Sequence, residues 1–201
     1  MTSIAPDGGP LIKGAVLREY LLWYERRVGA MKVAEVAAGL PPELADTVKT
    51  SMPALGLLAS TWYPVGLSHY FLDRMLVIEG CGDEGRELAR EANRELVPKM
   101  IRGVYKVLYR TVASPELYAR HVGRHWRKLH STGDRAFVVR GPGEGFSLVA
   151  NWEGHHPALC WITIYTMVSL FEMMGYEHVA AERTRCVSHG GEDCATVLRW
   201  R

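Results

Sequence analysis

The sequence has 201 residues, with 24 Lys and Arg against 22 Asp and Glu, and 48% of it is apolar. These values exclude an intrinsically disordered chain, which needs few apolar residues and a large net charge. The nearly balanced charge also argues against a strongly basic nucleic-acid-binding protein. Length and composition together favour one soluble globular domain.

Two uncharged stretches are long enough or apolar enough to be tested as membrane spans. Residues 50–72 have sufficient length, but Pro53 and Pro64 would break the helix that lipid requires. Residues 157–171 are too few to cross roughly 30 Å of hydrocarbon. The first ten residues lack the basic flank and the apolar run of a signal peptide. We therefore expect a cytoplasmic protein that does not enter a membrane.

Helical patterns fill the first two thirds of the chain. Apolar residues recur at helical spacing over 11–29, and a Pro-Pro-Glu sequence at 41–43 is typical of a short helix start. The longest amphipathic segment is 84–112, in which Pro98 predicts a kink. A Ser-Pro pair opens the next helix, which we expect over 114–130.

The pattern changes after residue 131. Two β-prone runs, 135–140 and 145–152, flank a Gly-Pro-Gly sequence and predict a hairpin. Residues 157–172 are apolar almost all the way round, which indicates a helix covered by other elements. Two final strands are expected at 177–188 and 194–200.

This order of elements indicates an α+β fold, in which N-terminal helices precede an antiparallel sheet of two hairpins with a buried helix between them. We divide the chain into a flexible N-terminus, 1–10, and a single domain, 11–201. Within that domain we expect a helical part, 11–130, and a sheet-rich part, 131–201, with the buried helix lying across one face of the sheet.

Three cysteines are predicted to converge near the last hairpin. Cys186 and Cys194 flank its turn, and Cys160 lies on the helix that packs against the same sheet. Three thiolates suit tetrahedral zinc, for which His189 in the turn or Glu182 on the strand would be the fourth ligand. Glu182 is disfavoured by geometry, because four residues of strand span about 13 Å. The alternative is that all three thiols are buried small hydrophobic groups.

A resemblance enters at this hairpin, which reads Arg185-Cys-Val-Ser-His-Gly-Gly-Glu-Asp-Cys194. With Val197-Leu-Arg-Trp200 it resembles the C-terminal signature of 4-vinyl reductase-type domains, small-molecule sensors with a fold like the TRAPP vesicle-tethering subunits. The stretches 156–160 and 171–175 look still closer to an uncharacterised paralogous family of myxobacterial proteins.

What this resemblance implies is a TRAPP-like fold, a dimer, and zinc held by Cys160, Cys186 and Cys194. The glutamate ligand of the family falls three residues before the first hairpin cysteine. This sequence has Arg183 there, with Glu182 one place away.

A second candidate site is a pocket for a small aromatic or hydrocarbon-like molecule between the buried helix and the sheet. Apolar walls with a few polar groups are typical of such pockets, although plain hydrophobic core has the same composition. The candidate lining residues are Trp126, Phe146, Trp152, Trp161, Tyr165 and Met167.

Histidines raise the question of haem. The pair His155-His156 precedes a helix, where capping is the simpler explanation. The chain has no haem-attachment motif, so the sequence does not favour haem.

These observations predict a non-catalytic sensory or regulatory domain that binds a small hydrophobic or aromatic ligand and a structural zinc. No GxSxG, HExxH or P-loop motif indicates catalysis. The alternatives are a TRAPP-like interaction or scaffold module without a ligand and, third, an enzyme acting on a tetrapyrrole or aromatic substrate. Expected partners are the small molecule, a second copy of the chain and an unidentified downstream protein, but neither a membrane nor nucleic acid.

Overall fold

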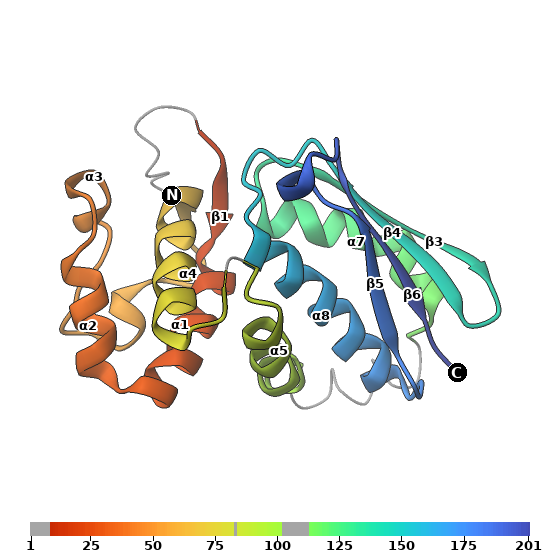
Figure 1. Cartoon of the computed structure of the whole chain (residues 1–201), viewed down its shortest axis with the longest axis horizontal. Helices are drawn as coiled ribbons and strands as arrows, with labels where there is room; N and C mark the ends of the chain where they lie inside the picture. The colour runs from red at the N-terminus through yellow and green to blue at the C-terminus, as the bar shows by residue number, and fades with distance from the viewer. Residues whose placement is uncertain (1–8, 83, 102–112) are drawn as a thin grey trace.

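The computed structural model describes residues 9–82, 84–101 and 113–201, and the predicted flexible N-terminus lies largely outside them. A short antiparallel pair, β1 (Leu11–Lys13) and β2 (Trp62–Pro64), joins the helices of the N-terminal part. These helices gather at one end of the molecule (Figure 1): α1 (Gly14–Val28), α2 (Ala30–Ala38), α3 (Pro42–Ala45) and α4 (Val65–Glu79), with a 3-10 turn η1 (Pro53–Gly56) between α3 and β2.

The other end of the molecule contains a four-stranded antiparallel sheet in the order β3-β4-β6-β5. Its strands are β3 (Asp134–Gly141), β4 (Glu144–Ala150), β5 (Ala180–Arg185) and β6 (Cys194–Arg199), and the 3-10 turn η2 (Val187–His189) precedes β6. Helices α7 (Pro115–Leu129) and α8 (Pro157–Met174) pack on the same face of the sheet. Phe137 of β3 contacts both Tyr118 of α7 and Phe171 of α8, with ring centroids 5.1 and 5.6 Å apart.

Helix α8 lies between α5 and the sheet. Its residues are apolar on every side, and it packs against α5 (Arg86–Met100) as well as against the sheet. A helix without a polar face is stable only when neighbouring elements remove all its sides from water. Helix α8 is as long and as apolar as a membrane-spanning helix. However, 61% of its 18 residues are buried inside the fold, as in the core helix of a globular domain.

The α+β class and the two predicted hairpins are confirmed, as is the helix that the Ser114 cap opens. The Ser114 hydroxyl accepts a hydrogen bond from the Leu117 N–H, which places the start of α7 at Pro115. Pro98 lies inside the last turn of α5, which ends at Met100, and the rest of the predicted 84–112 helix falls outside the described residues.

Two features differ from the sequence prediction. Residues 11–13 form a strand rather than the first turn of a helix, because they pair with β2. The Leu11 N–H also donates to the Ser131 hydroxyl, and Ile12 forms a bridge with His130. Helix α4 is the second difference, since it begins at Val65, inside the uncharged stretch 50–72, and continues to Glu79. Pro53 and Pro64 do not interrupt it, because both lie before its first residue.

The aromatic contacts around Phe171 make it the centre of the packing between α8 and the sheet. Phe171 is fully buried against Tyr118, Phe137 and Trp200. We predict that Phe171→Ala lowers the free energy of unfolding by about 3–5 kcal/mol, through lost burial and the cavity left behind. Urea denaturation followed by circular dichroism measures this change.

The matched control is Val138→Ala, a truncation on the outer face of the same sheet, where the residue is 56% exposed. It should change the unfolding free energy by no more than about 0.5 kcal/mol. Equal losses in the two variants would contradict the packing described for Phe171.

Candidate functional site

A cavity of about 530 Å³ lies between helices α1, α5, α7 and α8. Its walls are largely apolar, and each of the four helices contributes to them. The helical residues that line it are Val16, Glu19 and Tyr20 of α1; Asn93, Leu96, Val97 and Met100 of α5; Leu117, Tyr118, His121, Val122, His125, Trp126 and Leu129 of α7; and Ile162, Thr163, Thr166, Leu170 and Met174 of α8. This volume is within the range of small-molecule and cofactor sites.

Two histidines of α7 stand side by side on the cavity wall. His121 and His125 are four residues apart, hence on one helix face, and their ring centroids are 6.5 Å apart. His121 is half-buried, whereas His125 is more exposed. Burial and the neighbouring Lys128 lower the pKa of His125 below its ordinary value, so this imidazole is neutral near pH 7.

A third histidine closes the cavity at the end of α7. The His130 ring stacks on Trp126 with centroids 3.9 Å apart, and Trp152 meets both rings edge-on. Burial, together with the charge of Arg135, lowers the pKa of His130 to about 3. His130 is therefore a neutral imidazole at every physiological pH.

Arg135 brings a positive charge to the cavity wall. Its guanidinium lies 5.7 Å from the centre of the Trp126 ring, and its Nη2 donates to the Thr163 carbonyl at 3.4 Å. Its Nε is buried and finds no hydrogen-bond partner within the described part of the chain. A buried donor of this kind is ready to bind an anionic or carbonyl group.

A small polar group interrupts the apolar wall where α1, α5 and α8 meet. Asn93, only 1% exposed, donates from Nδ2 to the Tyr20 hydroxyl at 2.5 Å, and its Oδ1 lies 2.8 Å from the Thr166 hydroxyl. Burial raises the pKa of Tyr20, so the phenol keeps its proton. All three side chains line the cavity.

Of the six residues predicted to line a pocket, Trp126 alone lines this cavity. Trp152 packs behind Trp126, and Phe146 lies beneath the guanidinium of Arg140, 4.1 Å from its ring centre. The predicted location also differs. Between α8 and the sheet, where Met167 lies, only about 10 Å³ is empty, which is roughly the space of one water molecule.

Trp161 and Tyr165 lie on the side of α8 that faces arginines. The Trp161 ring has Arg183 4.3 Å and Arg86 5.0 Å from its centre. The Tyr165 hydroxyl accepts a hydrogen bond from Arg86 Nε at 3.1 Å. These two aromatic side chains anchor charged groups rather than line the cavity.

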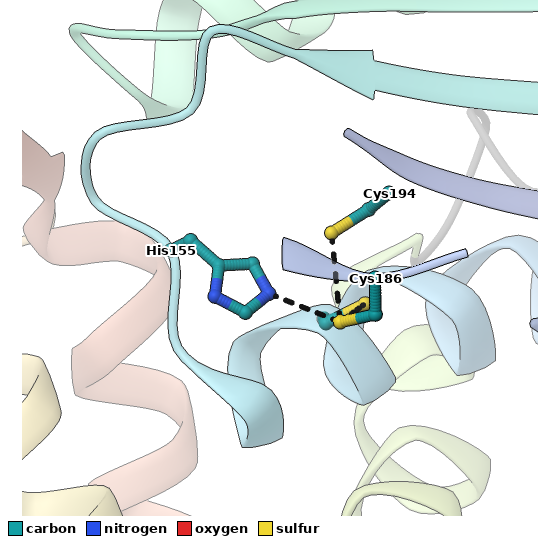
Figure 2. Close-up of side chains that lie close together, drawn as sticks. His155, Cys186 and Cys194 are labelled. Carbon is teal, nitrogen blue, oxygen red and sulfur yellow. Dashed lines mark hydrogen bonds between the residues drawn. The ribbon is translucent and has the colours of Figure 1, made fainter. Parts of the chain in front are cut away.

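The three predicted cysteines do converge. The Cys186 sulfur lies 3.7 Å from that of Cys194 and 3.9 Å from that of Cys160, and all three residues are buried. His155 is the fourth member, with Nε2 3.4 Å from the Cys186 sulfur, and Figure 2 shows it reaching Cys186 from the loop before α8. The ligand atoms of this thiol cluster, defined as Cys160, Cys186, Cys194 and His155, all lie within 4.8 Å of one another.

Glu182 and His189, the two expected fourth ligands, lie outside the thiol cluster. Glu182 is paired with Arg199 at 3.1 Å on the outer face of the sheet. His189 is mostly exposed and pairs with Glu84 at 2.8 Å. The position of Glu182 on the strand and that of His189 in the turn suggested them as ligands. Neither position gives information on the direction of the His155 side chain in the loop before α8.

Capping accounts for only one member of the His155-His156 pair. His156 Nδ1 accepts from the Ala158 N–H at the start of α8, and its Nε2 lies 2.9 Å from Asp73. Its neighbour His155 makes no such cap and lies beside the sulfurs instead. The sequence did contain a signal for this fourth member, because His155 lies only five residues before Cys160.

The thiol cluster is electrostatically coupled. Contacts from the Cys160 and Cys194 thiols, and from His155, lower the pKa of Cys186. Burial alone would lower the pKa of His155, but its contacts with Cys186 and Cys194 raise it to about 9. Proton sharing thus favours a negative sulfur at Cys186 beside a positive imidazole.

Comparisons with known proteins show which solved structures share this fold. No protein-family model matches the chain, and no curated protein matches it. Solved structures do match, over 94% of this chain. The chain has the H-NOX fold.

The H-NOX structures match almost end to end at low sequence identity. The Fe(II) unliganded H-NOX protein from K. algicida is 13% identical, with 97% of its chain covered and a TM-score of 0.67. The Fe(II)NO form of an H-NOX protein from S. oneidensis is 8% identical, with 99% covered and a TM-score of 0.68. An oxygen-binding H-NOX domain related to soluble guanylate cyclases, in its oxygen complex, is 9% identical, with 95% covered and a TM-score of 0.62.

These structures correct several expectations. The likeness to 4-vinyl reductase-type and TRAPP-like domains is wrong, because the structures that match nearly the whole chain are H-NOX proteins. The matching H-NOX structures include Fe(II), Fe(II)NO and oxygen-bound forms, and one of them was used to probe the function of heme distortion in that family. The predictions of a non-haem ligand domain or scaffold, of zinc as the cofactor and against haem are therefore wrong as well.

The buried neutral state of His130 gives a pH-dependent stability. Between pH 6.5 and its folded pKa of about 3, the unfolded chain binds a proton at His130 that the folded chain does not. Stability from this group is complete above pH 6.5 and falls as the pH drops below that value, by at most about 1.4 kcal/mol per pH unit. Urea denaturation at pH 8.0, 6.5 and 5.5 measures the slope.

The control for this slope is His130→Phe, which keeps a flat ring against Trp126 but cannot take a proton. The fall in unfolding free energy between pH 6.5 and 5.5 should be smaller in this variant than in the unmodified protein. Identical slopes would show that His130 does not cause the effect.

Proposed function

We propose that this domain holds a haem in the cavity between α1, α5, α7 and α8 and senses a small gas molecule there. The observation that carries the proposal is the pair of imidazoles, His121 and His125, on the wall of a cavity that is otherwise apolar. Histidine is the proximal ligand of haem iron in globins and peroxidases. The fold shared with H-NOX proteins supports the same assignment.

The residues present fit such a group. A haem is a flat macrocycle, apolar on its faces and edges except for two carboxylates. The cavity presents apolar side chains from four helices, and the buried Arg135 Nε at its wall lacks a partner within residues 113–201 and the other described ranges. An arginine is suited to a carboxylate because its donors match the two oxygens.

Among the three histidines, His121 is the best candidate for the iron ligand. It lies in the middle of the α7 residues that line the cavity, which run from Leu117 to Leu129. His125, one turn later, is more exposed, and the His130 ring is already stacked on Trp126. A half-buried imidazole at the centre of the wall can turn a nitrogen toward the cavity without leaving its helix.

The other cavity residues have defined tasks in this proposal. When bound, the haem supplies an iron at which a small gas molecule coordinates. The apolar side chains of α5 and α8 keep water out of the cavity. The protonated Tyr20 hydroxyl accepts from Asn93 and offers its own hydrogen to a polar atom in the cavity.

The proposal predicts haem binding that depends on α7. Purified full-length protein titrated with hemin should develop the sharpened, shifted Soret band of a histidine-ligated haem. His121→Gly should weaken binding about tenfold or more, since it removes the axial ligand. Added imidazole should restore the spectrum by occupying the vacated position, which separates loss of the ligand from loss of the fold.

The matched control is His178→Asn, a histidine outside the cavity lining whose backbone has a φ of +50° that asparagine tolerates. It should bind hemin as the unmodified protein does. An unchanged hemin spectrum in the unmodified protein, or equal binding after substitution of His121, His125 and His130 in turn, would contradict the proposal.

A further inference from the structure

Helix α7, at the sheet end of the molecule (Figure 1), carries a row of basic side chains outside the cavity lining. Arg120, Arg124, Arg127 and Lys128 are all exposed. Positions 120, 124 and 128 follow one another every four residues, and position 127 lies three residues after 124. All four therefore share one side of the helix, and we call them the basic stripe.

The basic stripe belongs to a strongly basic part of a chain that is nearly neutral overall. Residues 96–133 contain eight of the 24 Lys and Arg but only one of the 22 Asp and Glu. Their net charge is +7, although the net charge of the whole chain is +2, so the remaining residues carry −5. A concentration of one sign of charge attracts partners of the opposite sign.

The four cations have no carboxylate partner within the described part of the chain. The ion pairs there involve other basic residues. Glu116, one turn before Arg120, has its carboxylate 2.7 Å from the Ser114 hydroxyl, from which it accepts a hydrogen bond. Residues 102–112 supply no counter-ion, because their sequence contains neither Asp nor Glu.

The stripe also places like charges next to one another. Arg120, Arg124 and Lys128 stand four residues apart, a spacing at which like charges on a helix repel and lower its stability. The helix dipole compensates Lys128 in the last turn, but Arg120 and Arg124 lie too far from that end. Burial is the main cause of the lowered pKa of His125, and the charges of Lys128 and Arg124 lower it further. This side of α7 is therefore electropositive.

We propose that the basic stripe is a docking surface for an acidic segment of another protein, a helix with Asp or Glu along one face. Successive turns of α7 present cations about 6 Å apart along the axis, and an acidic helix laid beside it presents carboxylates at the same interval. Glu116 limits the contact at the start of α7, because it would repel a further carboxylate. This inference does not rest on the haem proposal, since none of the four cations lines the cavity.

A second copy of the chain does not match the stripe. The most acidic of the described helices is α5, and its exposed carboxylates are already in ion pairs. Glu87 pairs with Arg90 at 3.4 Å, and Glu91 pairs with Arg27 at 2.6 Å. Charge complementarity therefore favours a different, acidic protein.

Neither a membrane nor a nucleic acid fits the stripe as well. A helix that binds a lipid surface carries apolar side chains beside its cations, whereas Val122 and Trp126 of α7 are buried. A nucleic-acid single strand is bound by aromatic rings on which bases stack, and the exposed residues of α7 include no Phe, Tyr or Trp. A duplex would be held through its phosphates alone.

A nuclear magnetic resonance titration of the full-length protein tests the docking surface. The probe is an alanine-rich helical peptide with glutamates at positions i, i+4, i+7 and i+8, which match the spacing of the stripe. It should shift the backbone amide signals of residues 116–129. Binding should weaken about threefold or more between 10 and 150 mM salt, because the screening length falls from about 30 to about 8 Å. The same peptide with glutamines in place of the glutamates should shift none of these signals.

Charge reversal assigns the contact to α7. Arg124→Glu should weaken peptide binding about tenfold, because repulsion replaces attraction at the centre of the stripe. Arg124→Gln, which only removes the charge, should weaken it less, by about threefold. The matched control is Arg74→Glu, since Arg74 is an exposed arginine of α4 that forms no ion pair within the described residues. This variant should bind the peptide within about twofold of the unmodified protein.

The proposal is overturned if the glutamate peptide shifts no amide signal of α7, or if Arg74→Glu weakens binding as much as Arg124→Glu does. A short DNA duplex and phosphatidylglycerol vesicles are tested as competitors. If either displaces the peptide at a concentration below that of the peptide itself, the stripe is a site for that competitor, and the proposal of an acidic protein partner is wrong.

Discussion

The need to cover an apolar helix on every side organises this structure. Helix α8 has no polar face, so each of its sides must be packed against another element. The sheet and α7 cover one part through Phe137, Tyr118 and Trp200 around Phe171, and α5 covers another. The N-terminal helices join this assembly through α5 and through the pairing of β1 with His130.

Both candidate sites depend on this arrangement. On the side facing α5 and α7, Ile162, Thr166 and Leu170 of α8 form one wall of the cavity where two imidazoles stand. On the side facing the hairpin, Cys160 meets Cys186, and His155, in the loop before the helix, lies beside the same sulfur. One helix thus positions the proposed haem site on one side and the thiol cluster on the other, with Arg135 contacting the Thr163 carbonyl near both.

Local patterns predicted the elements with strong signals of their own. The apolar run of α8, the Ser114 cap and the turn glycines at 141 and 143 can each be recognised from neighbouring residues in the sequence alone. The convergence of three cysteines also followed from the hairpin. Strand β1 depends instead on pairing with β2 and on contacts with Ser131 and His130, all far along the chain. The cavity was missed because the local pattern of α7 does not show that α1 and α5 lie opposite His121 and His125.

A crystal structure of the full-length protein crystallised with hemin tests the central claim most directly. The account predicts density for the macrocycle between α1, α5, α7 and α8, with the His121 imidazole on the iron and the Arg135 guanidinium beside a carboxylate. Density for hemin at any other place on the molecule, or a filled cavity in which the α7 histidines contact no iron, would contradict it.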